Sequence, residues 1–217
     1  RLIVDPGVPT YTAGPDRQYA RSAAAHNGPV VDGFDQLELW GSFRVGRRAR
    51  AEAIDDPALD GFAPLWCAGR IETRTGVTMH RFVGLWPGSG LLICDAWVGG
   101  SGAPASSSFL VPGDWRLAGQ DPPVFSSDAA DVRVIAPIGG LEPIQSARHW
   151  LQFDVELPAH RIVLRPETRY DQQCAALWWG CGDPPDAERV DALLQRLAAV
   201  YDGGRDTGTP RQATDGP

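Results

Sequence analysis

The chain has 217 residues, of which 43% are hydrophobic and 22% charged, so it is long enough to bury one substantial core and ordinary for a globular protein. Its formal net charge of -7 disfavours nucleic acid as a partner, because an acidic surface repels a polyanion. No apolar run is long enough to span a bilayer, so the sequence predicts no membrane anchor.

Short apolar segments separated by turn residues run through the first half of the chain. Leu2-Ile3-Val4 predicts a short strand that Pro6-Gly7 stops, and residues 8–20, with three further breakers, predict a loop. The turn residues at 86–90 predict a hairpin connection between two of the later strands. The predicted strands cover residues 37–48, 65–73, 77–85 and 91–99.

The second half continues in the same way. Residues 151–157 alternate strictly between apolar and polar side chains, which predicts a half-buried strand, and 162–164 predict another strand after a turn at Pro158-Ala159. Many short strands spaced by turn residues are typical of stacked antiparallel sheets. We therefore predict an all-β fold, an antiparallel β-sandwich over residues 1–182.

One amphipathic helix is predicted at the C-terminal end of the chain, over residues 183–203. Asp183 suits its N-cap, Pro184 its first turn and Gly203 its end. Residues 204–217 are rich in Gly, Thr, Pro and Asp and predict a disordered tail. The apolar stripe of the helix, interpreted as core packing, consists of Val190, Leu193, Leu194, Leu197, Val200 and Tyr201.

Four cysteines are present, and none of them forms a C-x-x-C pair, so the spacing excludes a zinc ribbon and a thioredoxin-like motif. Cys94 lies in an apolar run and is interpreted as a buried free thiol. Cys174 and Cys181 flank a Leu-Trp-Trp-Gly segment and could pair in an oxidising compartment, which the sequence leaves open.

Three motifs near the start of the chain occur in a characteristic order. They read Asp5-Pro6-Gly7, then Y-A-R-S-A-A-A-H-N over residues 19–27, then V-D-G-F-D-Q over residues 31–36. Their order and spacing resemble the C-terminal β-sandwich domain of the heparinase II/III-like polysaccharide lyase family. There, a D-P-G turn is followed by a segment like Y-F-R-S-T-A-A-H-N-T and by V-D-G-x-D-Q. Gly28 departs from the pattern, because the family usually has Thr at this position.

The resemblance implies a lyase that cleaves an anionic, uronic-acid-containing polysaccharide by β-elimination. In the family the tyrosine base and the group that neutralises the uronate carboxylate lie mostly on an N-terminal α-helical toroid. We expect that toroid to precede Arg1, so this chain is interpreted as a fragment that is inactive alone and part of an enzyme in the full-length protein. The resemblance also implies a bacterial protein in the periplasm or secreted.

The resemblance further implies a zinc site. Family members that bind zinc use the aspartate of D-P-G, the histidine of the A-H-N segment and a histidine upstream of both. Carried over to this sequence, the first two ligands are Asp5 and His26, and the third is expected before Arg1. Carboxylate and imidazole are ordinary zinc ligands, which agrees with this assignment.

Tyr11, Arg21 and Asn27 are the candidate substrate-binding residues. Tyr11 follows the D-P-G turn, where the family can place a tyrosine near the substrate, and Arg21 could make a bidentate contact to a uronate or sulfate. The alternatives are that Arg21 braces its loop in a salt bridge and that Asn27 holds a backbone turn. A cluster of arginines either binds anionic groups or forms an exposed strand face; it comprises Arg44, Arg47, Arg48 and Arg50.

The competing prediction is a carbohydrate-binding or scaffold β-sandwich without catalysis. Eight tryptophans are present, but they are spread along the chain, so most are interpreted as core and sheet-edge packing rather than a sugar-stacking face. His80 alternates within a predicted strand and is interpreted as structural.

Overall fold

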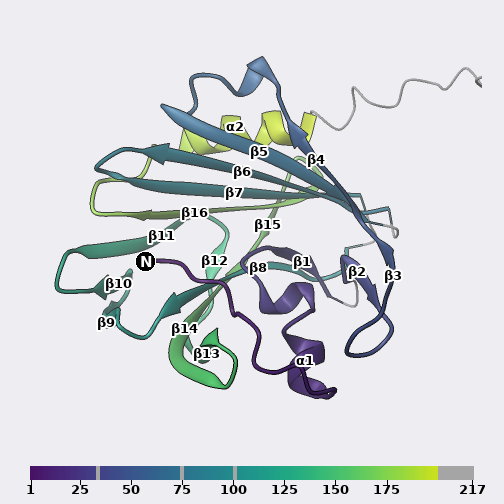
Figure 1. Ribbon diagram of the computed structural model, residues 1–217. Coiled ribbons are helices and arrows are strands. Elements are labelled where there is room, and N and C mark those ends of the chain that lie inside the picture. Colours follow the sequence, from purple (N-terminus) through teal and green to yellow (C-terminus); the bar gives the residue numbers. More distant parts are fainter. Residues whose placement is uncertain (33–34, 74–75, 100–101, 200–217) are drawn as a thin grey trace, which may run out of the picture.

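Antiparallel pairing joins most strands into two sheets that face each other, with a helix over the outer face of the larger one (Figure 1). This computed structural model describes residues 1–32, 35–73, 76–99 and 102–199. Along these residues the predicted all-β class with one substantial helix is confirmed.

The larger sheet has nine strands. In spatial order they are β4 (Arg50–Ile54), β5 (Leu65–Glu72), β6 (Thr78–Trp86), β7 (Gly90–Val98), β16 (Gln172–Gly180), β11 (Asp131–Ile138), β10 (Pro123–Ser126) and β9 (Arg116–Gln120), with β15 (Glu167–Arg169) beside β16.

The smaller sheet has five strands and a separate hairpin has two. The five are β1 (Pro29–Val31), β8 (Ala105–Pro112), β14 (Val155–Arg165), β12 (Gly140–Leu141) and, beside β14, β13 (Gln145–Gln152). The hairpin consists of β2 (Leu37–Leu39) and β3 (Val45–Arg48). The helical segments are α1 (Pro15–Tyr19), the 3-10 turns η1 (Ala23–Ala25) and η2 (Pro57–Leu59), and α2 (Ala187–Ala199).

Two cores lie on opposite faces of the larger sheet, and strand β16 contributes to both. Ala175, Leu177 and Trp179 pack between the sheets, while the alternate residues, among them Trp178, pack under α2. A strand buried on both faces has no polar face, which explains the continuous apolar run over this segment. On α2 the predicted stripe is confirmed as core packing for its described members, the buried Val190, Leu193, Leu194 and Leu197.

Several predicted boundaries are wrong. Residues 2–4 form no strand, although the Val4 N–H donates to the Leu110 carbonyl at 3.0 Å. The segment 37–48 is the β2–β3 hairpin rather than one strand, and the predicted loop 8–20 contains α1. By contrast, β5, β6 and β7, and the turn that pairs Trp86 with Gly90, agree closely with the prediction.

The alternation over 151–157 also misled the strand prediction. The segment crosses the tight turn between β13 and β14, where Asp154 adopts a φ of 57°, and Pro158-Ala159 lie inside β14 instead of in a turn. Apolar and polar residues therefore alternate through a turn as well as along the strands that flank it. Helix α2 begins at Ala187, after Asp186, and not at Asp183; its predicted end and the tail 204–217 lie outside the described residues.

The open question of a Cys174–Cys181 disulfide is answered by strand β16. Cys174 is buried within the strand, and Cys181 directly follows it and is exposed; both thiols are free. Seven residues of extended chain separate their Cα atoms by roughly 20 Å, whereas a disulfide needs about 4–7 Å. Burial also raises the pKa of the Cys174 thiol to about 11, which makes it a weak nucleophile.

Candidate functional site

Asp5 and His26, 21 positions apart in the sequence, lie in contact. One Asp5 carboxylate oxygen is 2.8 Å from His26 Nδ1, and the other accepts a hydrogen bond from the Gly7 N–H at 3.0 Å. The two side chains are 63% and 44% exposed, so the pair is accessible from solvent. The juxtaposition expected from the two motifs is therefore observed.

The D-P-G turn that carries Asp5 is fixed against the smaller sheet. The Trp150 N–H of β13 donates to the Pro6 carbonyl at 2.8 Å. Gly7 has a φ of 75°, and a Cβ atom there would collide with the Trp150 carbonyl oxygen. Only glycine fits both constraints, which is the physical reason for the third residue of the motif.

The loop that carries His26 is held through its backbone carbonyls. Arg161 of β14 donates to the carbonyl of Ala24 at 3.0 Å and, through a second nitrogen, to the Tyr19 hydroxyl at 2.7 Å. Ser108 of β8 donates to the His26 carbonyl at 3.2 Å. The small residues of η1 let the chain approach the sheet this closely, and Ala25 is fully buried.

Beneath this loop lies an ion pair whose carboxylate is buried. Arg81 of β6 makes two parallel hydrogen bonds of 2.7 Å to the two oxygens of Asp95 on β7, and a third nitrogen donates to the Asn27 carbonyl at 2.8 Å. The Asp95 side chain is only 1% exposed and also accepts a hydrogen bond from Ser107 on β8. The pair thereby connects both sheets to the residue next to His26.

Asn27 is fully engaged with backbone groups. Its Nδ2 donates to the Val4 carbonyl and its Oδ1 accepts from the Leu110 N–H, each at 2.8 Å. The amide therefore holds backbone, as in the alternative considered for it, and its predicted contact with sugar stays untested. Arg21 likewise braces its loop, but by donating to the Gly41 carbonyl at 2.8 Å and not through the salt bridge considered.

Tyr11 lies in a group of exposed rings. It is 61% exposed, its ring centroid is 4.5 Å from that of Phe153, and the Arg17 guanidinium lies 5.1 Å from its centroid. The cluster Arg44, Arg47, Arg48 and Arg50 is exposed on and beside β3 and β4. Within it, Arg50 pairs with Glu52 at 2.6 Å.

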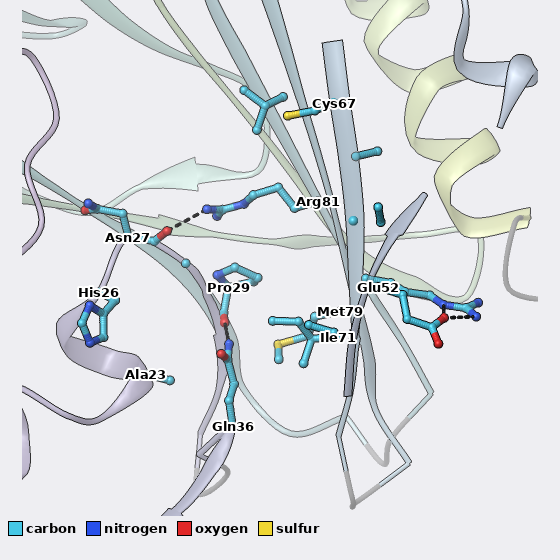
Figure 2. A pocket seen from close by; sticks show the side chains of 17 residues that line it. Ala23, His26, Asn27, Pro29, Gln36, Glu52, Cys67, Ile71, Met79 and Arg81 are labelled. Carbon is cyan, nitrogen blue, oxygen red and sulfur yellow. Dashed lines mark hydrogen bonds and ion pairs between the residues drawn. The ribbon is translucent and has the colours of Figure 1, made fainter. Parts of the chain in front are cut away.

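A cavity of about 620 Å³ opens beside His26 and Asn27 (Figure 2). Its lining includes small and apolar residues of β4, β5 and β6, such as Ala51, Ile71 and Met79. Glu52 also lines it, and a hydrogen bond from Arg70, followed by the charge of Arg50, lowers the pKa of this carboxyl. The candidate site thus consists of an exposed Asp–His pair at the edge of a largely apolar recess.

The Asp5–His26 pair presents two donor atoms of the kinds that zinc binds in proteins. One carboxylate oxygen and one imidazole nitrogen match the donor atoms of protein zinc sites, which are usually four-coordinate. Within the described ranges, no group of three or more His, Cys, Asp or Glu side chains could hold a metal. The donor chemistry fits zinc, and the remaining ligands would have to come from outside these residues.

The fold and these loops define the class of protein, an antiparallel β-sandwich of the polysaccharide-lyase C-terminal type. The chain belongs to the family described as Heparinase II/III-like, C-terminal, whose pattern it matches over residues 1–162. No curated protein matches the sequence.

Solved structures with the same fold include lyases of this kind. A heparan sulfate lyase HepC mutant from Pedobacter heparinus superposes with a TM-score of 0.61 at 12% identity, over 85% of this chain and 29% of that structure. A structure titled heparinase III superposes with a TM-score of 0.55 at 14% identity, over 84% of this chain and 28% of that one. This chain therefore spans less than a third of the length of these lyases.

Sequence reasoning missed Arg81, Asp95, Ser108 and Arg161, the side chains that position the loop. Asp95 did leave a signal, because it is the one charged residue in the apolar run of β7. A charge within a strand buried on both faces requires a partner. Its partner Arg81 lies directly opposite on β6, so the hairpin predicted at residues 86–90 carried a signal that could have found it.

Proposed function

We propose that this chain is the β-sandwich portion of a polysaccharide lyase that cleaves uronic-acid-containing chains by β-elimination. The observation that carries the proposal is the Asp5–His26 contact, built from the two motifs of the family to which the chain belongs. The catalytic base and the group that neutralises the uronate carboxylate would come from an N-terminal helical toroid outside these residues, so this chain alone would be inactive.

Asp5 and His26 would be two zinc ligands, and the third would be a histidine outside this chain. Bound zinc would supply a positive charge that links the D-P-G turn to the A-H-N loop. Asp5 is prepared for this role because the Gly7 N–H fixes its carboxylate. A zinc ion shared by the two side chains would replace the proton that lies between Asp5 Oδ2 and His26 Nδ1, which are 2.8 Å apart. We further propose an anionic polysaccharide as substrate and a periplasmic or secreted location.

The first test measures metal and activity in the protein that joins this chain to its helical domain. Purified without chelator, the protein should contain zinc by elemental analysis. His26→Ala should lose the zinc and the ultraviolet absorbance of the unsaturated product, because one metal ligand is missing. His160→Ala, a histidine on β14 that does not touch Asp5, is the matched control and should keep both. Metal-free wild-type protein would refute the ligand assignment.

A carbohydrate-binding role without catalysis is the second candidate. Tyr11, Trp40 and Phe43 are 61%, 61% and 58% exposed, and exposed rings are surfaces on which sugars stack. The same assay separates the two functions. Binding of a uronate oligosaccharide by the joined protein, without formation of unsaturated product, would favour the binding role over the lyase.

A further inference from the structure

The N-terminal segment runs along the edge of β8 beyond the point where β1 ends. Strand β1 pairs with Ala105–Ser107 of β8. The Ser108 N–H then donates to the Gly28 carbonyl at 3.3 Å, and the Val4 N–H donates to the Leu110 carbonyl at 3.0 Å. The edge of one strand is thus covered by β1, by the His26 loop and by the segment that leads into Asp5.

At Val4 this edge has an unusual hydrogen-bond pattern. A hydrogen-bonded pair in an antiparallel sheet exchanges two direct backbone bonds. Here one bond, from Val4 to Leu110, is direct, and the return bond passes through the Asn27 carboxamide. The Leu110 N–H donates to Asn27 Oδ1 and Asn27 Nδ2 donates to the Val4 carbonyl, both at 2.8 Å. Only one orientation of the amide satisfies both partners.

The inserted amide belongs to the residue next to His26 and binds the residue next to Asp5. Val4 directly precedes Asp5 and His26 directly precedes Asn27, so the amide joins the backbone neighbours of the two residues. The Asn27 carbonyl is itself fixed by Arg81, which is held by the buried Asp95. The amide therefore sits on a rigid support and links the Val4 carbonyl to the Leu110 N–H of β8.

We propose that Asn27 is the positioning residue that sets the Asp5–His26 distance, a role that deepens and rests on the proposed zinc function. Asn27 contacts no metal or sugar in this role and acts through the backbone of Val4. A carboxylate of the same shape at this position would still accept from Leu110 but would face the Val4 carbonyl without a proton to donate.

The test compares Asn27→Asp with Gln36→Glu in the full chain. Gln36 lines the same cavity and donates from Nε2 to the Pro29 carbonyl at 3.2 Å, so Gln36→Glu makes the same chemical change without touching Val4.

Without metal, the Val4 N–H of Asn27→Asp should exchange up to about tenfold faster, since one hydrogen bond has been lost. The proportion of the two His26 tautomers, which depends on the contact with Asp5, should also change, and nitrogen NMR measures it. Gln36→Glu should leave both unchanged.

Two further measurements complete the test. Zinc affinity in the joined protein, measured by competition with a coloured chelator, should fall about 10-fold to 100-fold in Asn27→Asp, as expected for a residue that orients a ligand. If Asn27→Asp does not fold, Asn27→Gln replaces it, because it keeps the amide but lengthens it by one methylene. An unchanged His26 tautomer in the variant tested would overturn the proposal. A shifted tautomer in a wild-type protein that binds no zinc would support the positioning role and refute the zinc site.

Discussion

Arg81 and Asp95 form an ion pair whose energetic importance follows from its burial. Both partners lie under the His26 loop, and the 1% exposed Asp95 carboxylate has each oxygen hydrogen-bonded. When two opposite charges leave water together, their attraction offsets the free energy that each loses in hydration. A single charge left without its partner keeps that cost. The pair is therefore weak evidence for net stabilisation and strong evidence that neither residue can be lost alone.

We expect Asp95→Ala to lower the free energy of unfolding by about 3–5 kcal/mol, because it leaves the Arg81 guanidinium without its partner. Urea denaturation measures the change. Glu156→Ala is the control, since Glu156 pairs with Arg148 at 3.0 Å on the surface, and an exposed pair contributes about 0–1 kcal/mol. Equal effects of the two substitutions would show that the burial of Asp95 is not what matters.

At the level of elements, the start of helix α2 is fixed by the residue that caps its first turn. The Asp186 carboxylate accepts a hydrogen bond from the Arg189 N–H at 2.7 Å, which is the geometry of an N-cap. Asp183, the cap predicted from sequence, instead pairs with Arg133 at 3.0 Å and is 92% exposed. The sequence Asp-Pro-Pro-Asp over residues 183–186 offers two acidic residues as N-cap, and the second of them, Asp186, caps the helix.

Asp186→Ala should therefore destabilise the protein by about 1 kcal/mol, because the first turn of α2 loses a partner for a backbone N–H. Thermal unfolding followed by circular dichroism measures it. Asp183→Ala removes only an exposed ion pair and should cost about 0–1 kcal/mol. A larger loss in Asp183→Ala than in Asp186→Ala would contradict the observed start of the helix.

At the scale of the whole molecule, His80 connects α2 to the larger sheet. It is fully buried on β6, and its Nδ1 donates to the Leu197 carbonyl of α2 at 2.7 Å. Burial, followed by the nearby charge of Arg70, lowers the pKa of His80, although the Leu197 bond opposes this. The structural role expected for His80 from its strand position agrees with this placement.

The lowered pKa of His80 makes folding sensitive to acid. The unfolded chain takes up a proton near pH 6.5, whereas the folded chain does so only at lower pH, so stability is present above this value and is lost as the pH falls below it. One such proton contributes at most about 1.4 kcal/mol per pH unit. Urea unfolding between pH 7.5 and about pH 5 should show this decline, and His80→Gln should have a shallower one. Parallel curves would rule out His80 as the cause.

Part of the molecule could be predicted because the pattern is local. The antiparallel sandwich, the apolar stripe of α2 and the strands β5, β6 and β7 follow from alternation, helical spacing and turn residues. The segment 151–157 shows the limit, since the same alternation runs through the β13–β14 turn. Periodicity reports which side chains are apolar, and it does not report where the chain reverses.

The sequence by itself determined the fold class, the family motifs and the identity of the Asp5–His26 pair, because each depends on residues close together or on a fixed motif order. Only the tertiary structure decided how the pair is held. The Asn27 amide between Val4 and Leu110 and the Arg81–Asp95 pair beneath it join residues from 14 to 83 positions apart. The Asn27 contacts arise because segments distant in sequence become neighbours in a sheet, and no local pattern encodes which segments those will be. The Arg81–Asp95 pair is more local, because it follows from the register of the β6–β7 hairpin.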